Sequence, residues 1–236
     1  PLGVIGIAVG TALLPLLSRQ IRTGEDAAAM ASQNRALELA LLLTLPCAVG
    51  LAVLSLPIMQ VLFERGAFTA SDAAATAHVL AAYALGLPAY VLVKVLVPGF
   101  FARKDTKTPV KIAVVCLIAN VVFILILLWP LAQVGIALAT ALAAWLNAGL
   151  LGAGLRREGY LRLDARLKRR LPRIALASVL MGLVLWLLGP WLTPLPQSLA
   201  LALLILVGAA CFAVLAHLTG AMALREVKAA IKGRQP

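Results

Sequence analysis

The stretch VLVKVLVPGFFARKDTKTPVKIAVVCLIANVVFILILLW, from Val91 to Trp129, joins two apolar runs through a short loop that is rich in cations. An apolar run of about 20 residues is long enough for an α-helix to cross the ~30 Å hydrocarbon layer of a bilayer. Backbone groups have no water partner there, so a spanning segment must be a helix or part of a closed barrel. Neither run alternates between apolar and polar residues as a barrel strand does, and we therefore predict two membrane-spanning helices.

The rest of the sequence has the same character as this stretch. Of its residues, 63% are hydrophobic and only 13% are charged, whereas soluble domains have about 45–50% apolar and about 25% charged residues. We therefore predict an all-α polytopic membrane protein with about seven transmembrane helices. The predicted spans are Leu2–Leu17, Ala36–Phe63, Ala74–Phe101, Val110–Trp129, Val134–Leu155, Ile174–Leu188 and Ser198–Leu218.

The lysines and arginines are concentrated in alternate loops. Nineteen of the 21 follow the first, third, fifth or seventh predicted span, whereas the loops between contain only Arg65. An excess of cations in alternate loops is typical of cytoplasmic loops. We therefore predict that the basic loops and the C-terminus are cytoplasmic. Topology and attraction to anionic headgroups then explain the net charge of +12, so we expect no nucleic-acid partner.

The sequence offers little for catalysis or metal binding. Its two histidines, His78 and His217, have no carboxylate or thiolate at helical spacing, and no nucleotide-binding or metalloprotease motif is present. The acidic residues are all expected in loops or at the ends of spans. We therefore expect no catalytic residue and no metal site.

The main polar residues inside the predicted spans are Lys94, Asn120, Thr140 and Asn147, with Thr44, Tyr83, Tyr90 and Ser178 as weaker members. An ionised lysine at the bilayer centre costs between ~3 and more than ~10 kcal/mol, so such a residue usually faces a cavity or a partner. We predict that Lys94 lines a substrate cavity; the alternative is that its ammonium group snorkels to the interface. Asn147 is a second candidate for the cavity, although an amide in a span also serves to bond a neighbouring helix.

Two pairs of residues have further candidate roles. Asn120 and Thr140 are candidates for an ion site, with helix packing and a bond to the backbone one turn earlier as their respective alternatives. Pro98 and Gly99 lie one turn beyond Lys94. Proline removes a helical hydrogen bond and bends the axis, so we predict a hinge there.

The block LFERGAFTASDAAATAHVLAAYALGLPAYVLVKVLVPGFFARKDTKTPVKIA, Leu62 to Ala113, strongly resembles the MurJ (MviN) lipid II flippases of bacterial peptidoglycan synthesis. Two further segments, GVIGIAVGTALLPLLSRQ and VGIALATALAAWLNAGLL, support this resemblance. It implies the second half of a fourteen-helix, two-lobe transporter of the MATE-like superfamily. The chain would then lack the first lobe and the start of the second, so the N-terminal half of the same protein is an expected partner.

The resemblance also implies a division of the chain. Residues 1–155 would form most of the second lobe, and residues 156–173 a basic cytoplasmic linker. Residues 174–220 would form a terminal helix pair with a groove for the lipid tail, and residues 221–236 a cytoplasmic tail.

By the same resemblance, the expected function is to move lipid II, an undecaprenyl-pyrophosphate-linked muropeptide, across the bacterial inner membrane by alternating access. The expected partners are lipid II and membrane lipids, and no cofactor is expected. Lys94 would supply positive charge for the pyrophosphate. Some members use a sodium site, and Asn120 and Thr140 match two of its positions, but Ile124 stands at its acidic position. Sodium, protons and the membrane potential all stay open as the coupling source.

Two rival functions stay open beside this one. A drug or other oligosaccharide-lipid exporter of the same superfamily would have the same helices. A membrane glycosyltransferase would need an acidic catalytic residue at the outer face, where Glu64 and Asp72 are the only candidates.

Overall fold

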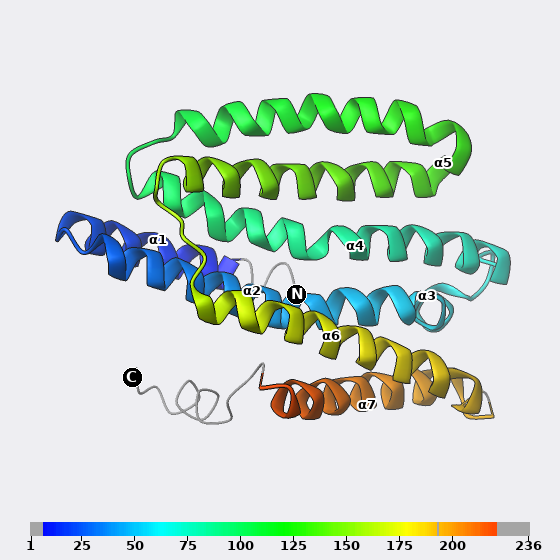
Figure 1. The fold of residues 1–236 in the computed structure, drawn as a ribbon. Helices are drawn as coiled ribbons and strands as arrows, with labels where there is room; N and C mark the ends of the chain where they lie inside the picture. Colours follow the sequence, from blue (N-terminus) through cyan, green and yellow to red (C-terminus); the bar gives the residue numbers. More distant parts are fainter. Residues whose placement is uncertain (1–6, 193, 221–236) are drawn as a thin grey trace.

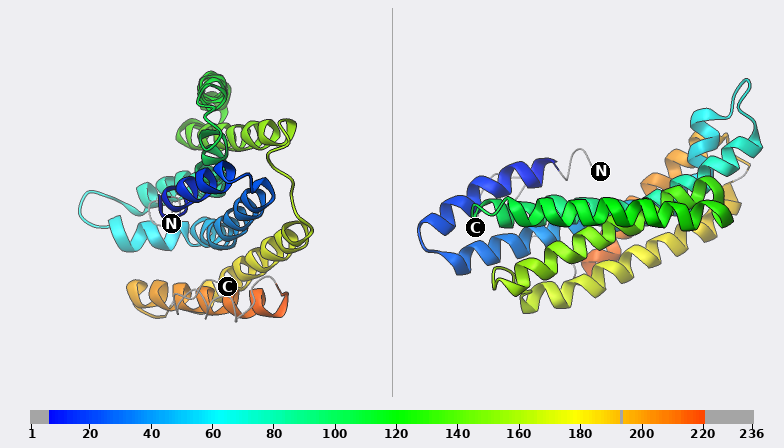
Figure 2. Two further views of the ribbon diagram at one scale, coloured as in Figure 1. Left: turned by 90° about the vertical axis from the view of Figure 1, so that its left-hand side faces the viewer. Right: turned by 90° about the horizontal axis from the view of Figure 1, so that it is seen from above.

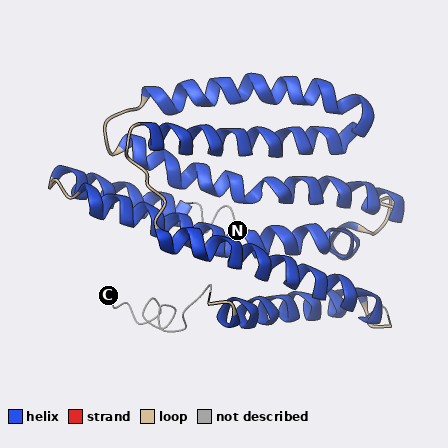
Figure 3. Cartoon of the chain, viewed as in Figure 1, coloured by secondary structure: helices blue, strands red, loops and turns tan. Residues whose placement is uncertain are grey.

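The computed structural model describes residues 7–192 and 194–220, which form helices joined by short loops, with no strand in these ranges (Figures 1 and 3). In chain order the elements are α1 Ile7–Arg22, α2 Asp26–Val53, α3 Ser55–Phe63, α4 Ala70–Phe101, α5 Lys107–Arg157, α6 Ala165–Leu188, the 3-10 turn η2 Gly189–Leu192 and α7 Gln197–Leu218. The start of the first predicted span and the predicted tail 221–236 lie outside the described residues.

Helix α5 is a hairpin of two helical arms. Its 51 residues would make a rod of about 77 Å, far longer than the ~30 Å hydrocarbon layer. The chain reverses at Ala132, which has the non-helical angles φ 46° and ψ −125°, and the two arms run antiparallel (Figure 1). The two spans predicted on either side of Pro130 are therefore both present.

The second predicted span is divided and begins earlier than expected. Its residues belong to α2, which starts at Asp26, and to the short α3; Leu54 separates the two helices. The predicted start of the span at Ala36 was too late for the helix, because the first turns of α2 are polar and their composition does not predict a membrane span. They extend the helix beyond its apolar part.

Helix α6 also begins before its apolar part. Asp164 caps the helix by accepting a hydrogen bond from the backbone N–H of Leu167, at 2.7 Å. The predicted basic linker, 156–173, therefore comprises the end of α5, the loop 158–164 and the first turns of α6.

Helices α2 and α4 lie at the centre of the molecule. The second arm of α5 packs on α4, α6 packs on α2, and α7 packs on α6 (Figure 2). Large apolar side chains face outward on the first arm of α5, where Leu117 is 63% and Leu125 64% exposed. Such a surface suits lipid rather than water. Five of the described helices are long and apolar enough to cross a membrane, with α5 counted once.

The two ends of the helix bundle differ in the number of cations near their connections. The α1–α2, α4–α5 and α5–α6 connections lie at the left-hand end in Figure 1, and the clustered cations lie in the last two of these connections and in the helix turns that adjoin all three. The α3–α4 loop, the turn of α5 and the α6–α7 connection lie at the right-hand end. The described connections thus place the basic loops together, as the alternation along the sequence requires.

Candidate functional site

A groove of about 490 Å3 lies between α4 and the two arms of α5. All four of the main polar residues predicted from the spans line it: Lys94, Asn120, Thr140 and Asn147. The other lining residues are Tyr90, Val93, Ala113, Cys116, Leu117, Ala143 and Ala144. The structure thus brings together residues from three segments that are far apart in the sequence.

The helical repeat explains why these side chains share one groove. On the second arm of α5, Thr140 and Asn147 are separated by two turns and therefore lie on one face. Asn120 lies on the first arm, and the reversal at Ala132 turns that arm back along the second. Helix α4 supplies Lys94, and it is tied to the second arm by a hydrogen bond from Trp145 Nε1 to the carbonyl of Leu85, at 2.9 Å.

The four side chains differ in how their polar atoms are satisfied. Lys94 is exposed and has no ion-pair partner within the described ranges. Asn120 Oδ1 is buried and accepts no hydrogen bond from any described group. Thr140 donates to the carbonyl of Ile136, one turn earlier, at 2.9 Å, which is the local bond expected as its alternative role. Its oxygen keeps acceptor capacity.

The chemistry of this lining suits an anion better than a cation. Lys94 is the only charged residue among the lining residues, and a charge beside low-dielectric walls acts strongly on a ligand. The amides of Asn120 and Asn147 add donors. No acidic residue lines the groove, and Ile124 is not among the lining residues. The lining therefore offers no carboxylate to compensate a bound sodium ion.

The predicted hinge residues lie outside this groove. Helix α4 passes through Pro98 and Gly99 without interruption, and both residues are buried. A Cβ on Gly99 would lie 2.5 Å from Nε2 of Gln33 on α2. Close packing between α2 and α4 therefore accounts for the glycine in this structure, and the hinge stays a prediction.

A second groove, of about 590 Å3, lies between α3, α6 and α7. Its lining is mostly apolar and includes Leu185, Trp186, Leu201 and Leu204. Most of its lining residues belong to the terminal helix pair 174–220, for which a lipid-tail groove is expected, and the others belong to α3 and the end of α2.

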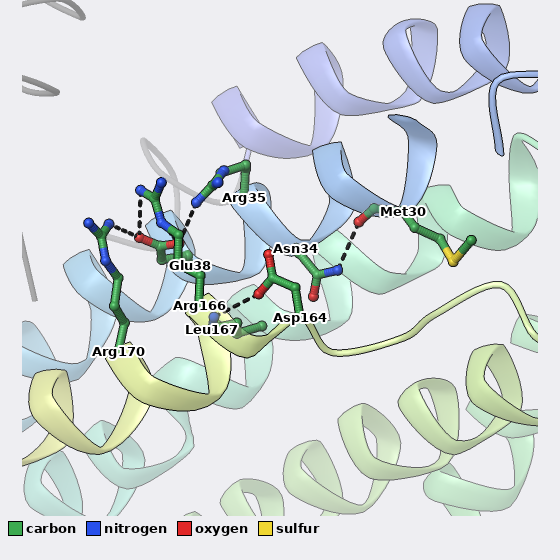
Figure 4. Close-up of polar contacts among 8 residues, drawn as sticks. All are labelled: Met30, Asn34, Arg35, Glu38, Asp164, Arg166, Leu167 and Arg170. Carbon is green, nitrogen blue, oxygen red and sulfur yellow. Dashed lines mark hydrogen bonds and ion pairs between the residues drawn. The ribbon is translucent and has the colours of Figure 1, made fainter. Parts of the chain in front are cut away.

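A cluster of charges surrounds Glu38 and was not predicted from the sequence. This residue was expected at the end of a span, yet it lies within α2 and is only 6% exposed. Its carboxylate forms ion pairs with Arg35 at 3.1 Å, with Arg166 at 3.2 Å and with Arg170 (Figure 4). The one signal in the sequence was an acidic residue inside the apolar run ALELALLL.

Neighbouring contacts reinforce the same junction. Asn34 Nδ2 donates to the carbonyl of Arg162 at 2.8 Å, which ties the α5–α6 loop to α2. The guanidinium of Arg103 lies 4.2 Å from the ring centre of Tyr160 in a cation–π contact. The basic loop is therefore held against α2 and α4 by specific contacts, in addition to its role in topology.

Comparison with known proteins gives one consistent family. The family model described as lipid II flippase MurJ matches residues 1–208. A probable lipid II flippase MurJ of Rhizobium tropici is 42% identical over 244 aligned residues, which cover 100% of this chain and 46% of the relative. The corresponding protein of Rhizobium meliloti is 46% identical over 203 residues, which cover 86% of this chain and 38% of the relative.

A solved structure agrees with the sequence relatives. The structure titled lipid II flippase MurJ, inward closed conformation, matches with a TM-score of 0.76 at 28% identity, and the match covers 92% of this chain and 44% of that one. The chain thus spans about half the length of the relatives it matches. The predicted fold class, an all-α polytopic membrane protein of the MATE-like transporter type, is confirmed.

Proposed function

The chain belongs to the lipid II flippase MurJ family, and from that premise we propose that its protein moves lipid II from the inner to the outer leaflet of the bacterial inner membrane by alternating access. The observation that carries the proposal is the groove between α4 and α5, which is lined by a lysine without an ion-pair partner among the described residues and by two asparagines. A polyprenyl pyrophosphate is anionic at one end and apolar at the other. Its pyrophosphate head requires positive charge in a hydrated cavity if it is to cross the membrane.

In this proposal Lys94 contacts the pyrophosphate, and Asn147 donates a hydrogen bond beside it. The groove between α3, α6 and α7 takes the isoprenoid tail, because its lining is apolar and lies on the terminal helix pair. Asn120 and Thr140, which line the same groove as Lys94, are the candidates for an ion site. With Lys94 in the same groove and Ile124 at the position of the acid, coupling through protons or the membrane potential is favoured over sodium.

A drug or oligosaccharide-lipid exporter is the second candidate, since it would use the same kind of groove. The glycosyltransferase alternative has less support. Asp72 forms a capping box with Thr69 at the start of α4, where its Oδ2 accepts from the Thr69 backbone N–H at 2.9 Å. That contact gives the carboxylate a structural role.

Complementation tests the proposal. The protein in its full natural length should restore lipid II export in cells depleted of their flippase. Lys94→Ala should lower export at least roughly tenfold, since a hydrogen bond to a charged group contributes about 1.5–3 kcal/mol. Lys94→Arg should keep part of the activity because it keeps the charge.

The matched control is Lys107→Ala, which removes an exposed cation at the start of α5 and should leave export unchanged. Normal export by a membrane-inserted Lys94→Ala protein would contradict the proposed contact and favour the alternative that the Lys94 ammonium group snorkels to the interface. Rescue of drug tolerance without rescue of lipid II export would favour the exporter.

A further inference from the structure

A third groove, of about 370 Å3, lies beside the basic α5–α6 loop, between the second arm of α5 and α6. Its floor is formed by Leu37 and Leu41 of α2 and by Leu92 and Leu96 of α4. The volume is within the range of about 300–1,000 Å3 that small-ligand sites have. It shares no lining residue with the two grooves assigned above.

Two cations stand at one end of this groove. Arg156 belongs to the last turn of α5, and Lys168 to the first turns of α6. Both line the groove and are exposed, and neither has an ion-pair partner in the part of the chain that the structure describes. Arg166 and Arg170, by contrast, contact Glu38. Two arginines of the basic segment therefore hold α6 to α2, and two other cations of the segment line the groove.

The wall contributed by α5 is made of small residues. Gly149 and Gly152 line the groove, and a Cβ added to either would meet no atom within 4 Å. These two glycines and Arg156 are spaced three and four residues apart, so they lie on one face of the helix. The open strip from Ala148 to Arg156 is about 12 Å long.

We propose that this groove binds one anionic phospholipid of the phosphatidylglycerol type, from the leaflet on the basic side of the membrane. Its phosphate contacts Arg156 and Lys168, and part of an acyl chain lies along the open face of Gly149 and Gly152. A soluble anion has no use for the apolar floor. A zwitterionic headgroup brings a cation of its own next to two others, so the charge pattern selects an anionic lipid.

Such a lipid would contact α5 and α6 at once, because one cation comes from each helix. It would bridge the second arm of α5 and the terminal helix pair across the α5–α6 loop. The site does not depend on the proposed transport function, since it needs only the bilayer around the protein.

Native mass spectrometry on the purified protein in its full natural length tests this site. Phosphatidylglycerol and phosphatidylethanolamine with identical acyl chains are titrated separately, and the dissociation constant of the tightest bound lipid is compared. Phosphatidylglycerol should bind more tightly to the unmodified protein. Each cation near an anionic headgroup contributes roughly fivefold in affinity, so the double variant Arg156→Gln/Lys168→Gln should bind it roughly 25-fold more weakly.

A second pair of variants tests the groove itself. Gly152→Leu fills the open strip and should weaken the binding of both lipids, whereas Gly152→Ala should change little because it leaves the strip open. Arg157→Gln is the control for charge, since Arg157 is an exposed neighbour that does not line the groove. Unchanged thermal unfolding shows that each variant has folded.

Three results would overturn the proposal. The first is equal binding of the two lipids to the unmodified protein. The second is a loss in Arg157→Gln as large as that in the double variant. The third is displacement of phosphatidylglycerol by a polyprenyl pyrophosphate in the unmodified protein but not in Gly152→Leu, which would assign the groove to the transported lipid.

Discussion

Gly99 is a residue at which a hinge and a packing contact lead to different expectations. Its Cα faces the side chain of Gln33, which is 1% exposed and whose Nε2 has no hydrogen-bond partner among the described residues. We predict that Gly99→Ala lowers stability by about 1–3 kcal/mol, the usual cost of an overpacked contact. Thermal unfolding of the purified protein would measure this loss.

The matched test is the double variant Gly99→Ala/Gln33→Ala. If packing accounts for the glycine, removing the Gln33 side chain makes room for the new methyl group. The double variant should then lose less stability than the sum of the losses measured for Gly99→Ala and Gln33→Ala alone. Strict additivity, together with loss of transport in both Gly99 variants, would support the hinge instead.

At the scale of single residues, the lining of the groove between α4 and α5 was predicted from the sequence better than the ion pairs. Lys94 and Asn147 were predicted to line a cavity because placing a polar group in the hydrocarbon layer costs free energy. Glu38 was not, because the apolar run was taken to begin at Ala36, and an acidic residue near its start seemed solvated. Its partners Arg166 and Arg170 are more than 120 positions away, and no local pattern reveals such a pairing.

Among the elements, the α5 hairpin decides whether the groove between α4 and the two arms of α5 exists. Its turn depends on Gly135, because a Cβ at this position would overlap the backbone carbonyl of Leu127 on the first arm. We predict that Gly135→Ala costs about 3 kcal/mol, at the upper end for overpacking, since a backbone atom cannot rotate away. The measurement is thermal stability together with the yield of folded protein.

Gly152→Ala is the natural control for that variant. It makes the same substitution on the same arm of α5, but the new methyl group meets no atom within 4 Å. It should leave stability unchanged or slightly improved, because alanine favours a helix over glycine. Equal losses in the two variants would mean that α5 does not form this turn.

The order of the predicted spans along the chain followed from the sequence, whereas the ends of the described helices did not. Apolar runs mark where a helix is surrounded by lipid, so the two spans of α5 were predicted on either side of Pro130. The polar beginnings of α2 and α6 carry no such mark. The break at Leu54 is accompanied by Pro57 in the first turn of α3, which has no N–H to donate to the carbonyl of Val53 and whose ring disfavours a continuous helix there. Packing of α3 against α4 and α7 accompanies the break.

For the whole molecule, the main question is what holds the terminal pair α6–α7 to the rest of the bundle. The pair contacts the other helices mainly through α2 and α3. At the basic end that contact is the Glu38 cluster, in which the side chain of Arg170 is only 14% exposed. At the other end it is the apolar packing of Met181, Leu185 and Leu201 around Leu54. The two attachments differ in kind, so they can be separated experimentally.

We predict that Glu38→Gln releases the basic end of α6 while the apolar end stays attached. Breaking a buried ion pair by removing one partner costs about 3–5 kcal/mol, but Arg35 and Arg166 are partly exposed, and their share is about 0–1 kcal/mol each. Most of the loss therefore concerns Arg170. Spin labels on the basic ends of α2 and α6 should show a broader distance distribution in Glu38→Gln, and labels near Leu54 and Leu201 should not.

A compensating variant separates charge from packing in this junction. Glu38→Leu/Arg170→Leu removes both buried charges, and replacing a buried ion pair by apolar residues is often neutral or stabilising. The double variant should therefore recover the narrow distance distribution that Glu38→Gln loses, while Arg169→Gln, at an exposed neighbour, should not affect it. If the double variant stays as broad as Glu38→Gln, the arginines hold α6 through contacts other than Glu38. If Glu38→Gln is itself narrow, apolar packing alone positions the terminal pair.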